Sequence, residues 1–191
     1  MRALRLAALI ATFTLTLTPL DWGATGPFAV FPKAGRLLSP DRRYEVRDAS
    51  RAGSFSDFAG SFHSLWVFDL AGGQSRKLCD YFGTAAVAWS GNSEILITEY
   101  VSKKTSRALL FHLLMTEQPI VIDEPTLLRT IDPELRETIR GNDHVFIEAE
   151  RIENGTFYFR VWGYGQHDPK EFHWNCQQRP TERMLDCSAV H

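Results

Sequence analysis

The sequence of 191 residues lacks the short motifs that define common catalytic centres. It has no Gly-x-Ser-x-Gly elbow, no phosphate-binding loop, no dinucleotide fingerprint and no His-Glu-x-x-His pair. We therefore expect no cofactor, and no motif names a reaction.

An excess of charge of one sign is also missing. The chain has 21 basic and 23 acidic residues, which gives a net charge of −2. Nucleic-acid binding requires a clustered basic face, so we expect no nucleic-acid partner. With 44% hydrophobic residues the chain can pack a globular core.

Long apolar runs are absent except near the start, where residues 6–17 form an apolar stretch diluted by threonines. This stretch is shorter than the ~20 residues that span a bilayer, and it follows the basic residues Arg2 and Arg5. The pattern is typical of a secretory signal peptide. We predict that residues 1–24 are a signal peptide or an uncut N-terminal anchor, that no further transmembrane segment follows, and that the protein is periplasmic or secreted.

Cysteine is scarce, with three residues in the chain. Export permits disulfides, and an odd number leaves one thiol over. The polar stretch 177–183 between Cys176 and Cys187 can fold back as a loop, which predicts a disulfide between them. Cys79 follows apolar residues in an expected strand, where a small buried thiol is the simplest interpretation.

Short apolar stretches and turn residues alternate from Ser39 to Leu114. The stretches Leu65–Leu70 and Leu109–Met115 are apolar at consecutive positions, which indicates strands covered on both faces. Thirteen Phe and five Trp also favour strands. The sequence therefore predicts a mainly β fold with an antiparallel meander over residues 39–115.

Ser39-Pro40-Asp41-Arg42-Arg43-Tyr44 resembles the Ser-Pro-Asp-Gly-x-x turn of Tol-type and prolyl-oligopeptidase-type β-propeller blades. Trp89-Ser90-Gly91-Asn92-Ser93 is similar to the Trp-Ser-Pro-Asp-Ser form of that turn, and residues 65–73 are similar to the strand that ends such blades. The resemblance implies one to two blades over residues 39–115, arranged as a four-stranded antiparallel meander, and no catalytic residue. Arg42 stands where the family has Gly.

The C-terminal part, residues 126–191, has a different pattern. Asp132 is a good N-cap and Pro133 suits the first helical position, which predicts one short α-helix over residues 133–140. A disulfide tail is expected at the end of the chain. We predict that residues 27–191 form a single β-rich domain.

Residues 144–152 and 156–162 predict a β-hairpin around Asn154-Gly155. A three-residue loop, 153–155, is favoured over a two-residue loop because it sorts apolar residues to one face. This register also places Glu148 opposite Arg160. The hairpin forms a second β layer in the predicted fold.

Two groups of aromatic residues are candidate binding sites. Phe55, Phe58 and Phe62 belong to a Ser- and Gly-rich segment, 48–63, and either return to the core or form a lip that binds a partner. The second group either forms a ligand surface or fills the core of the C-terminal half, and comprises Trp162, Tyr164 and Trp174.

One cluster can hold a metal ion. Glu171 and His173 are two residues apart and would share a face of a strand, and His167 can join from the preceding turn. Polar surface residues beside a proline turn are the simpler interpretation.

These patterns give three functional hypotheses. The first is an exported, non-enzymatic binding or protein-interaction module for an envelope protein or a small ligand, presenting segment 48–63. The alternative is a metal-dependent or other hydrolase that uses His167, Glu171 and His173. The third is a structural half-propeller that completes its sheet by oligomerising.

Overall fold

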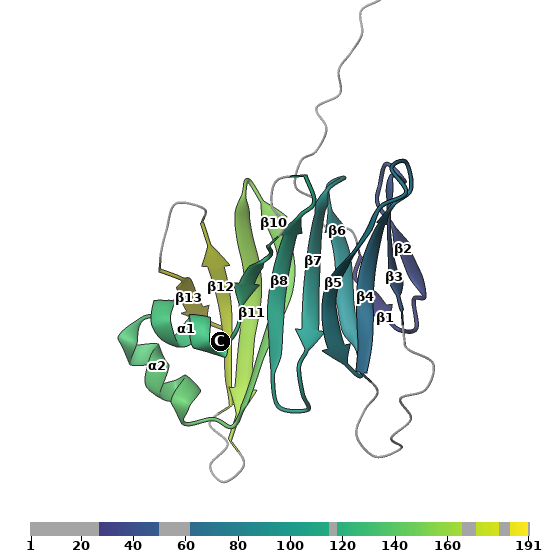
Figure 1. The fold of residues 1–191 in the computed structure, drawn as a ribbon. Helices are drawn as coiled ribbons and strands as arrows, with labels where there is room; N and C mark the ends of the chain where they lie inside the picture. Colours follow the sequence, from purple (N-terminus) through teal and green to yellow (C-terminus); the bar gives the residue numbers. More distant parts are fainter. Residues whose placement is uncertain (1–26, 50–61, 115–117, 166–170, 180–183, 191) are drawn as a thin grey trace, which may run out of the picture.

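The computed structural model describes residues 27–49, 62–114, 118–165, 171–179 and 184–190. These residues form three antiparallel β-sheets and two short helices, so the fold is mainly β, as predicted. The sheets follow one another along the molecule, with the helices beside the third sheet (Figure 1).

Each sheet is described by its strand order. The first sheet has the order β2-β3-β4-β5, with β2 (Arg36–Leu38), β3 (Tyr44–Asp48), β4 (Phe62–Asp69) and β5 (Ser75–Phe82). The second has the order β1-β6-β7-β8-β9, with β1 (Ala29–Phe31), β6 (Ala85–Ser90), β7 (Glu94–Tyr100), β8 (Ser106–His112) and β9 (Ile120–Ile122). The third has the order β10-β11-β12-β13, with β10 (His144–Glu153), β11 (Thr156–Tyr164), β12 (Phe172–Gln178) and β13 (Asp186–Ala189).

The stretch 39–115 contributes strands to two antiparallel sheets: β3, β4 and β5 complete the four-stranded meander β2-β3-β4-β5, and β6, β7 and β8 belong to the second sheet. The chain turns after Phe82 through Gly83, whose φ is +69°, and then begins a new sheet at β6. The physical reason lies in β7 and β8, whose consecutive apolar residues need a covering layer on each face. The second sheet is therefore the middle layer, between the first and third sheets.

Two hydrophobic clusters cover the two faces of the middle sheet. Ile95 and Ile97 belong to the cluster shared with the first sheet, whereas Leu96 belongs to the cluster shared with the third sheet. Successive side chains of a strand point to opposite faces, so this alternation places β7 between two cores. The predicted inner strand in β8 is confirmed, because Leu109 to Phe111 are buried at consecutive positions. The same prediction for Leu65–Leu70 is wrong: alternate residues of β4 are partly exposed and Leu70 is 49% exposed, because no further sheet covers the outward side of the first sheet in the described residues.

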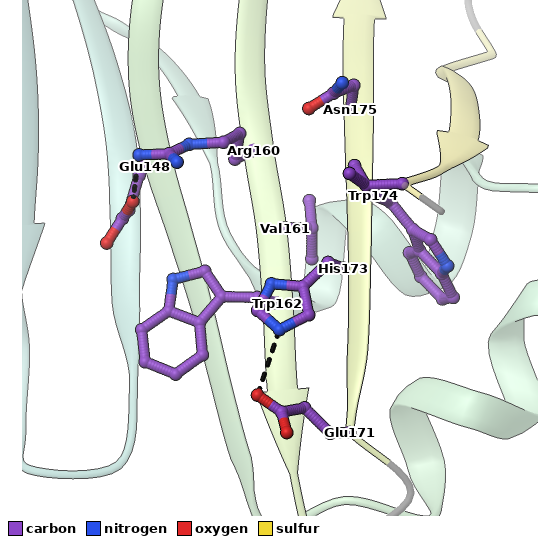
Figure 2. Close-up of a pocket in the computed structure, with 9 residues that line it drawn as sticks. Glu148, Arg160, Val161, Trp162, Glu171, His173, Trp174 and Asn175 are labelled. Carbon is purple, nitrogen blue, oxygen red and sulfur yellow. Dashed lines mark hydrogen bonds and ion pairs between the residues drawn. The ribbon is translucent and has the colours of Figure 1, made fainter.

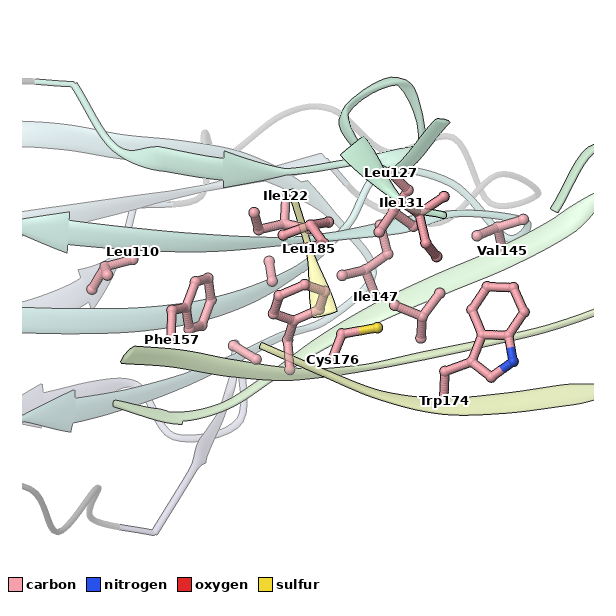
Figure 3. Packing of buried hydrophobic residues seen from close by; sticks show 14 of the residues in the cluster. Leu110, Ile122, Leu127, Ile131, Val145, Ile147, Phe157, Trp174, Cys176 and Leu185 are labelled. Atoms are coloured by element: carbon pink, nitrogen blue, oxygen red, sulfur yellow. The ribbon is translucent and has the colours of Figure 1, made fainter. Parts of the chain in front are cut away.

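Two helices pack against the hydrophobic cluster that the second and third sheets share. The predicted helix is present as α2 (Pro133–Arg140), with Asp132 as its N-cap, and a second helix, α1 (Glu124–Thr130), precedes it. The side chain of Asp123 accepts a hydrogen bond from the backbone N–H of Thr126 at 2.9 Å and so caps α1. Figure 3 shows Leu127 and Ile131 of this segment directed toward the third sheet.

The β10–β11 hairpin corrects the predicted turn. Glu153 pairs with Thr156, so the loop has two residues, Asn154 and Gly155, both with positive φ. A β-bulge between Ala149 and Arg151 then shifts the register by one residue. The bulge restores the predicted pairing of Glu148 with Arg160, so a two-residue loop followed by a bulge gives the apolar sorting for which a three-residue loop was predicted.

The C-terminal tail forms two paired strands, β12 and β13. Cys176 and Cys187 face each other across β12 and β13, and their sulfurs lie at disulfide distance, 2.02 Å. Cys79 is buried, as predicted, in the hydrophobic cluster that the first and second sheets share. This burial raises the pKa of its thiol. Of the helices in the described residues, neither is long and apolar enough to cross a membrane.

Candidate functional site

The outward side of the third sheet, here called the outer face, carries the candidate site. Val161 and Trp174 are paired and belong to the core, so the paired residues Trp162 and His173 lie on the opposite side of the sheet. Phe146 is paired with Trp162 from the other neighbouring strand. Three strands therefore contribute one ring each to a row across the outer face.

The rings of this row are in contact. The centroids of Phe146 and Trp162 are 4.2 Å apart and their planes differ by 24°, so one face of the indole packs on Phe146. Phe146 is only 6% exposed, whereas Trp162 is partly exposed. His144 and Tyr164 form a second stacked pair beside them, with centroids 4.4 Å apart. The outer face thus combines a buried aromatic base with partly exposed rings above it.

Ion pairs border these rings. Arg160 donates from Nη2 to Glu148 Oε2 at 2.9 Å, and its Nε lies 3.0 Å from Glu150 Oε1. The His173 Nε2 and Glu171 Oε1 atoms are 3.0 Å apart. The side chain of Arg160 is 56% exposed and that of His173 is 50% exposed, so both side chains are accessible to a ligand.

A hollow of about 500 Å³ lies over the outer face. Figure 2 shows its lining side chains, which are Glu148, Arg160, Val161, Trp162, Glu171, His173, Trp174, Asn175 and Val190. Volumes of roughly 300–1,000 Å³ are typical of small-molecule sites. The hollow is therefore large enough to hold a small ligand.

A second hollow, of about 440 Å³, lies beside the outer face and is lined by residues of β6, β7, β10 and β11. Glu148 and Arg160 line both hollows, and Tyr100 lines the second. Burial and the nearby Glu148 carboxylate raise the pKa of Tyr100, which keeps its hydroxyl protonated. The hydroxyl lies 3.5 Å from Glu148 Oε1 and helps to orient that carboxylate.

The predicted aromatic group divides between the two sides of the third sheet. Trp162 and Tyr164 lie on the outer face, and Tyr164 is 37% exposed. Trp174 belongs to the core, beside Phe172. Figure 2 shows its indole directed away from that of Trp162. The core interpretation thus holds for Trp174, whereas a ligand-binding role of Trp162 and Tyr164 stays a prediction.

The other aromatic group is described only in part. Phe62 is the first residue of β4, is 65% exposed and contacts Phe82 edge to face. It therefore lies on the surface and does not return to the core. Phe55 and Phe58 lie outside the described residues.

The predicted metal ligands are also described only in part. Glu171 and His173 are adjacent on the surface, whereas His167 lies outside the described residues. Within the described ranges no group of three or more His, Cys, Asp or Glu residues is placed to hold a metal ion. The metal site stays a prediction.

Four residues of the outer face were not among the predicted site residues: Phe146, Glu148, Arg160 and Asn175. The sequence holds a signal for two of them, because the predicted hairpin register already paired Glu148 with Arg160. Asn175 depends on the pairing of β12 with β11, which no turn motif indicates.

Comparison with models of protein families, with curated proteins and with solved structures gives no match for this chain.

Proposed function

We propose that this chain is an exported, non-enzymatic binding module whose ligand or partner docks on the outer face of the third sheet. One observation carries this proposal: the partly exposed Trp162 and the exposed His173 line a hollow that charged side chains border. Exposed aromatic rings with a few fixed polar groups are typical of binding sites.

Export is supported by the N-terminal pattern of residues 1–24 and by the Cys176–Cys187 pair. A disulfide between neighbouring strands persists in oxidising compartments and is rare in the cytosol. An envelope component, either a protein or a glycan, is therefore the partner that such a module would meet.

The pairing of the polar side chains on the outer face favours binding over catalysis. Glu148 and Glu150 both pair with Arg160, and Glu171 pairs with His173. A general base needs an available proton acceptor near the reacting atom. These paired groups suit recognition by fixed hydrogen bonds.

The proposal is tested by co-sedimentation of the mature chain with isolated envelopes of the cell that encodes it. The wild-type chain is compared with Trp162→Ala and with a matched control, Trp66→Ala. Trp66 is a partly exposed Trp in the first sheet, away from the outer face.

We expect Trp162→Ala to lower the bound fraction at least several-fold, because it removes the exposed ring, and Trp66→Ala to leave it unchanged. Equal binding by both variants, or no binding by the wild-type chain, would contradict the proposal. Thermal unfolding of each variant checks that the chain is folded.

A further inference from the structure

Two neighbouring rings of the outer face, those of the partly exposed Trp162 and the exposed His173, are here called the aromatic platform. Their centroids are 6.2 Å apart and their planes differ by only 11°. Figure 2 shows the two rings beside each other, with their faces toward the viewer. Phe146 stacks on one face of the indole, so the opposite face is the one available to a ligand.

Hydrogen-bonding groups surround the platform. The guanidinium of Arg160 is held by two carboxylates, Glu148 at 2.9 Å and Glu150 at 3.0 Å. The side-chain amide of Asn175 lines the same hollow and forms no hydrogen bond with another described residue. Carboxylates accept, a guanidinium donates and an amide does both. Such a mixture matches a ligand with several hydroxyl groups, each of which can donate and accept.

The charge around the platform argues against an ionic ligand. Three carboxylates, those of Glu148, Glu150 and Glu171, outnumber the guanidinium of Arg160, which disfavours phosphates and other anions. A cation would have to compete with Arg160 and His173 for those carboxylates. Cation sites also commonly use a cage of several rings, whereas the two rings of this platform are nearly parallel and do not enclose a ligand.

We propose that the hollow binds a neutral oligosaccharide. The apolar C–H side of one sugar ring lies on Trp162, and its hydroxyls bond to Arg160, Asn175 and Glu171. A sugar ring is flat enough for the platform, is apolar on its faces, and carries hydroxyls around its rim. The inference rests on the proposed function and names the class of ligand for the same surface.

Isothermal titration calorimetry tests the inference with four neutral probes at millimolar concentration: cellohexaose, N-acetylated chitohexaose, maltohexaose and xylohexaose. We expect at least one of them to bind the wild-type chain in the micromolar to millimolar range. Trp162→Ala should weaken that binding about tenfold or more, which corresponds to about 1.4 kcal/mol. Trp66→Ala, as the matched control, should leave it unchanged.

A second variant keeps the test decisive if Trp162→Ala unfolds. Asn175 is exposed and its side chain has no described partner, so Asn175→Ala should preserve the fold and weaken sugar binding about threefold or more. Binding of none of the four probes, or binding that neither variant weakens, would overturn the inference.

The outcome is separable from that of the proposed function. If envelope binding depends on Trp162 but a lysine-rich peptide competes for it and the four sugars do not, only the sugar inference fails. If envelope binding does not depend on Trp162, the proposed function fails first.

Discussion

The turn at Ser39, Pro40 and Asp41 shows how single residues determine the first sheet. Ser39 Oγ donates to Asp41 Oδ1 at 2.6 Å and accepts from the backbone N–H of Tyr44 at 2.9 Å. The hydrogen bond between Ser39 and Asp41 is the main interaction that holds the pKa of Asp41 below its usual value. The Ser-Pro-Asp sequence is therefore explained by the turn itself.

Arg42 carries strain in this turn, because its φ is +59°. The left-handed region costs a residue with a Cβ roughly 1–2 kcal/mol, and glycine avoids that cost but loses more entropy on folding. We expect Arg42→Gly to raise the free energy of unfolding by about 0.5–1 kcal/mol in urea. Ala71→Gly, at a turn residue without positive φ, is the control and should lower stability. A loss of stability in Arg42→Gly comparable to that of Ala71→Gly would count against this account.

The environment of Asp69 predicts that the stability of the fold depends on pH. The backbone N–H of Gly72, and then the side chain of Arg43, hold the pKa of Asp69 below its usual value of 3.8. A carboxyl with a lowered folded pKa stabilises the fold above its unfolded pKa, and this contribution is lost as the pH falls through the folded value. Asp69→Asn should therefore be less stable than the wild-type chain at neutral pH, and the difference should shrink below about pH 4.

Urea unfolding of both chains across this pH range measures the effect. Asp186→Asn serves as the control, since Asp186 lies on the edge strand β13 and pairs with Gln177. A wild-type advantage over Asp69→Asn that stays constant from neutral pH down to pH 2 would refute the role of the Asp69 charge.

At the scale of elements, the β10–β11–β12 ladder positions the outer face. Gly163 is paired with Val145 on one side and Phe172 on the other. A Cβ at this position would lie 2.6 Å from Phe172 Cε1 and would also collide with the carbonyl oxygen of His144. The absence of a side chain lets the ring of Phe172 pack against β11 at Gly163, on the core side of the sheet.

Gly163→Ala should consequently lower the free energy of unfolding by about 1–3 kcal/mol, because the strands must separate to admit the methyl group. Gly141→Ala is a matched control, since its nearest contact is 3.3 Å away and its φ is −78°. Chemical denaturation compares the two variants. If Gly163→Ala is as stable as Gly141→Ala, the strands admit the methyl group at no cost, which would contradict this prediction.

The Cys176–Cys187 pair supports the same ladder at its edge. Its sequence separation of 11 gives about 3 kcal/mol of stabilisation on the chain-entropy model. We expect the double variant Cys176→Ser, Cys187→Ser to lose about that amount in urea denaturation. If the loss is below about 0.5 kcal/mol, the disulfide has no structural role at this edge.

For the whole molecule, much of the architecture follows from the sequence. The consecutive apolar residues of β8 predicted an inner strand, and Asp132-Pro133 predicted α2. The division into separate sheets at Gly83 was not predictable, because a two-residue turn can equally continue a meander.

The candidate site was predictable only in part. The alternation of β11 separates Trp162 from Val161, but the register of β12 decides that His173 and Asn175 join Trp162 while Trp174 enters the core. A one-residue shift of β12 would place Trp174 on the outer face and turn His173 and Asn175 toward the core. No local motif specifies that register.

The most direct test of the central claim, that the outer face is the binding surface, is site-specific photo-crosslinking. A photoreactive amino acid is placed at Tyr164 on the outer face and, in a second chain, at Phe68 in the first sheet, and both chains are exposed to the envelopes. The account predicts a crosslinked adduct from position 164 and none from position 68. Adducts from position 68 alone, or from neither position, would contradict it.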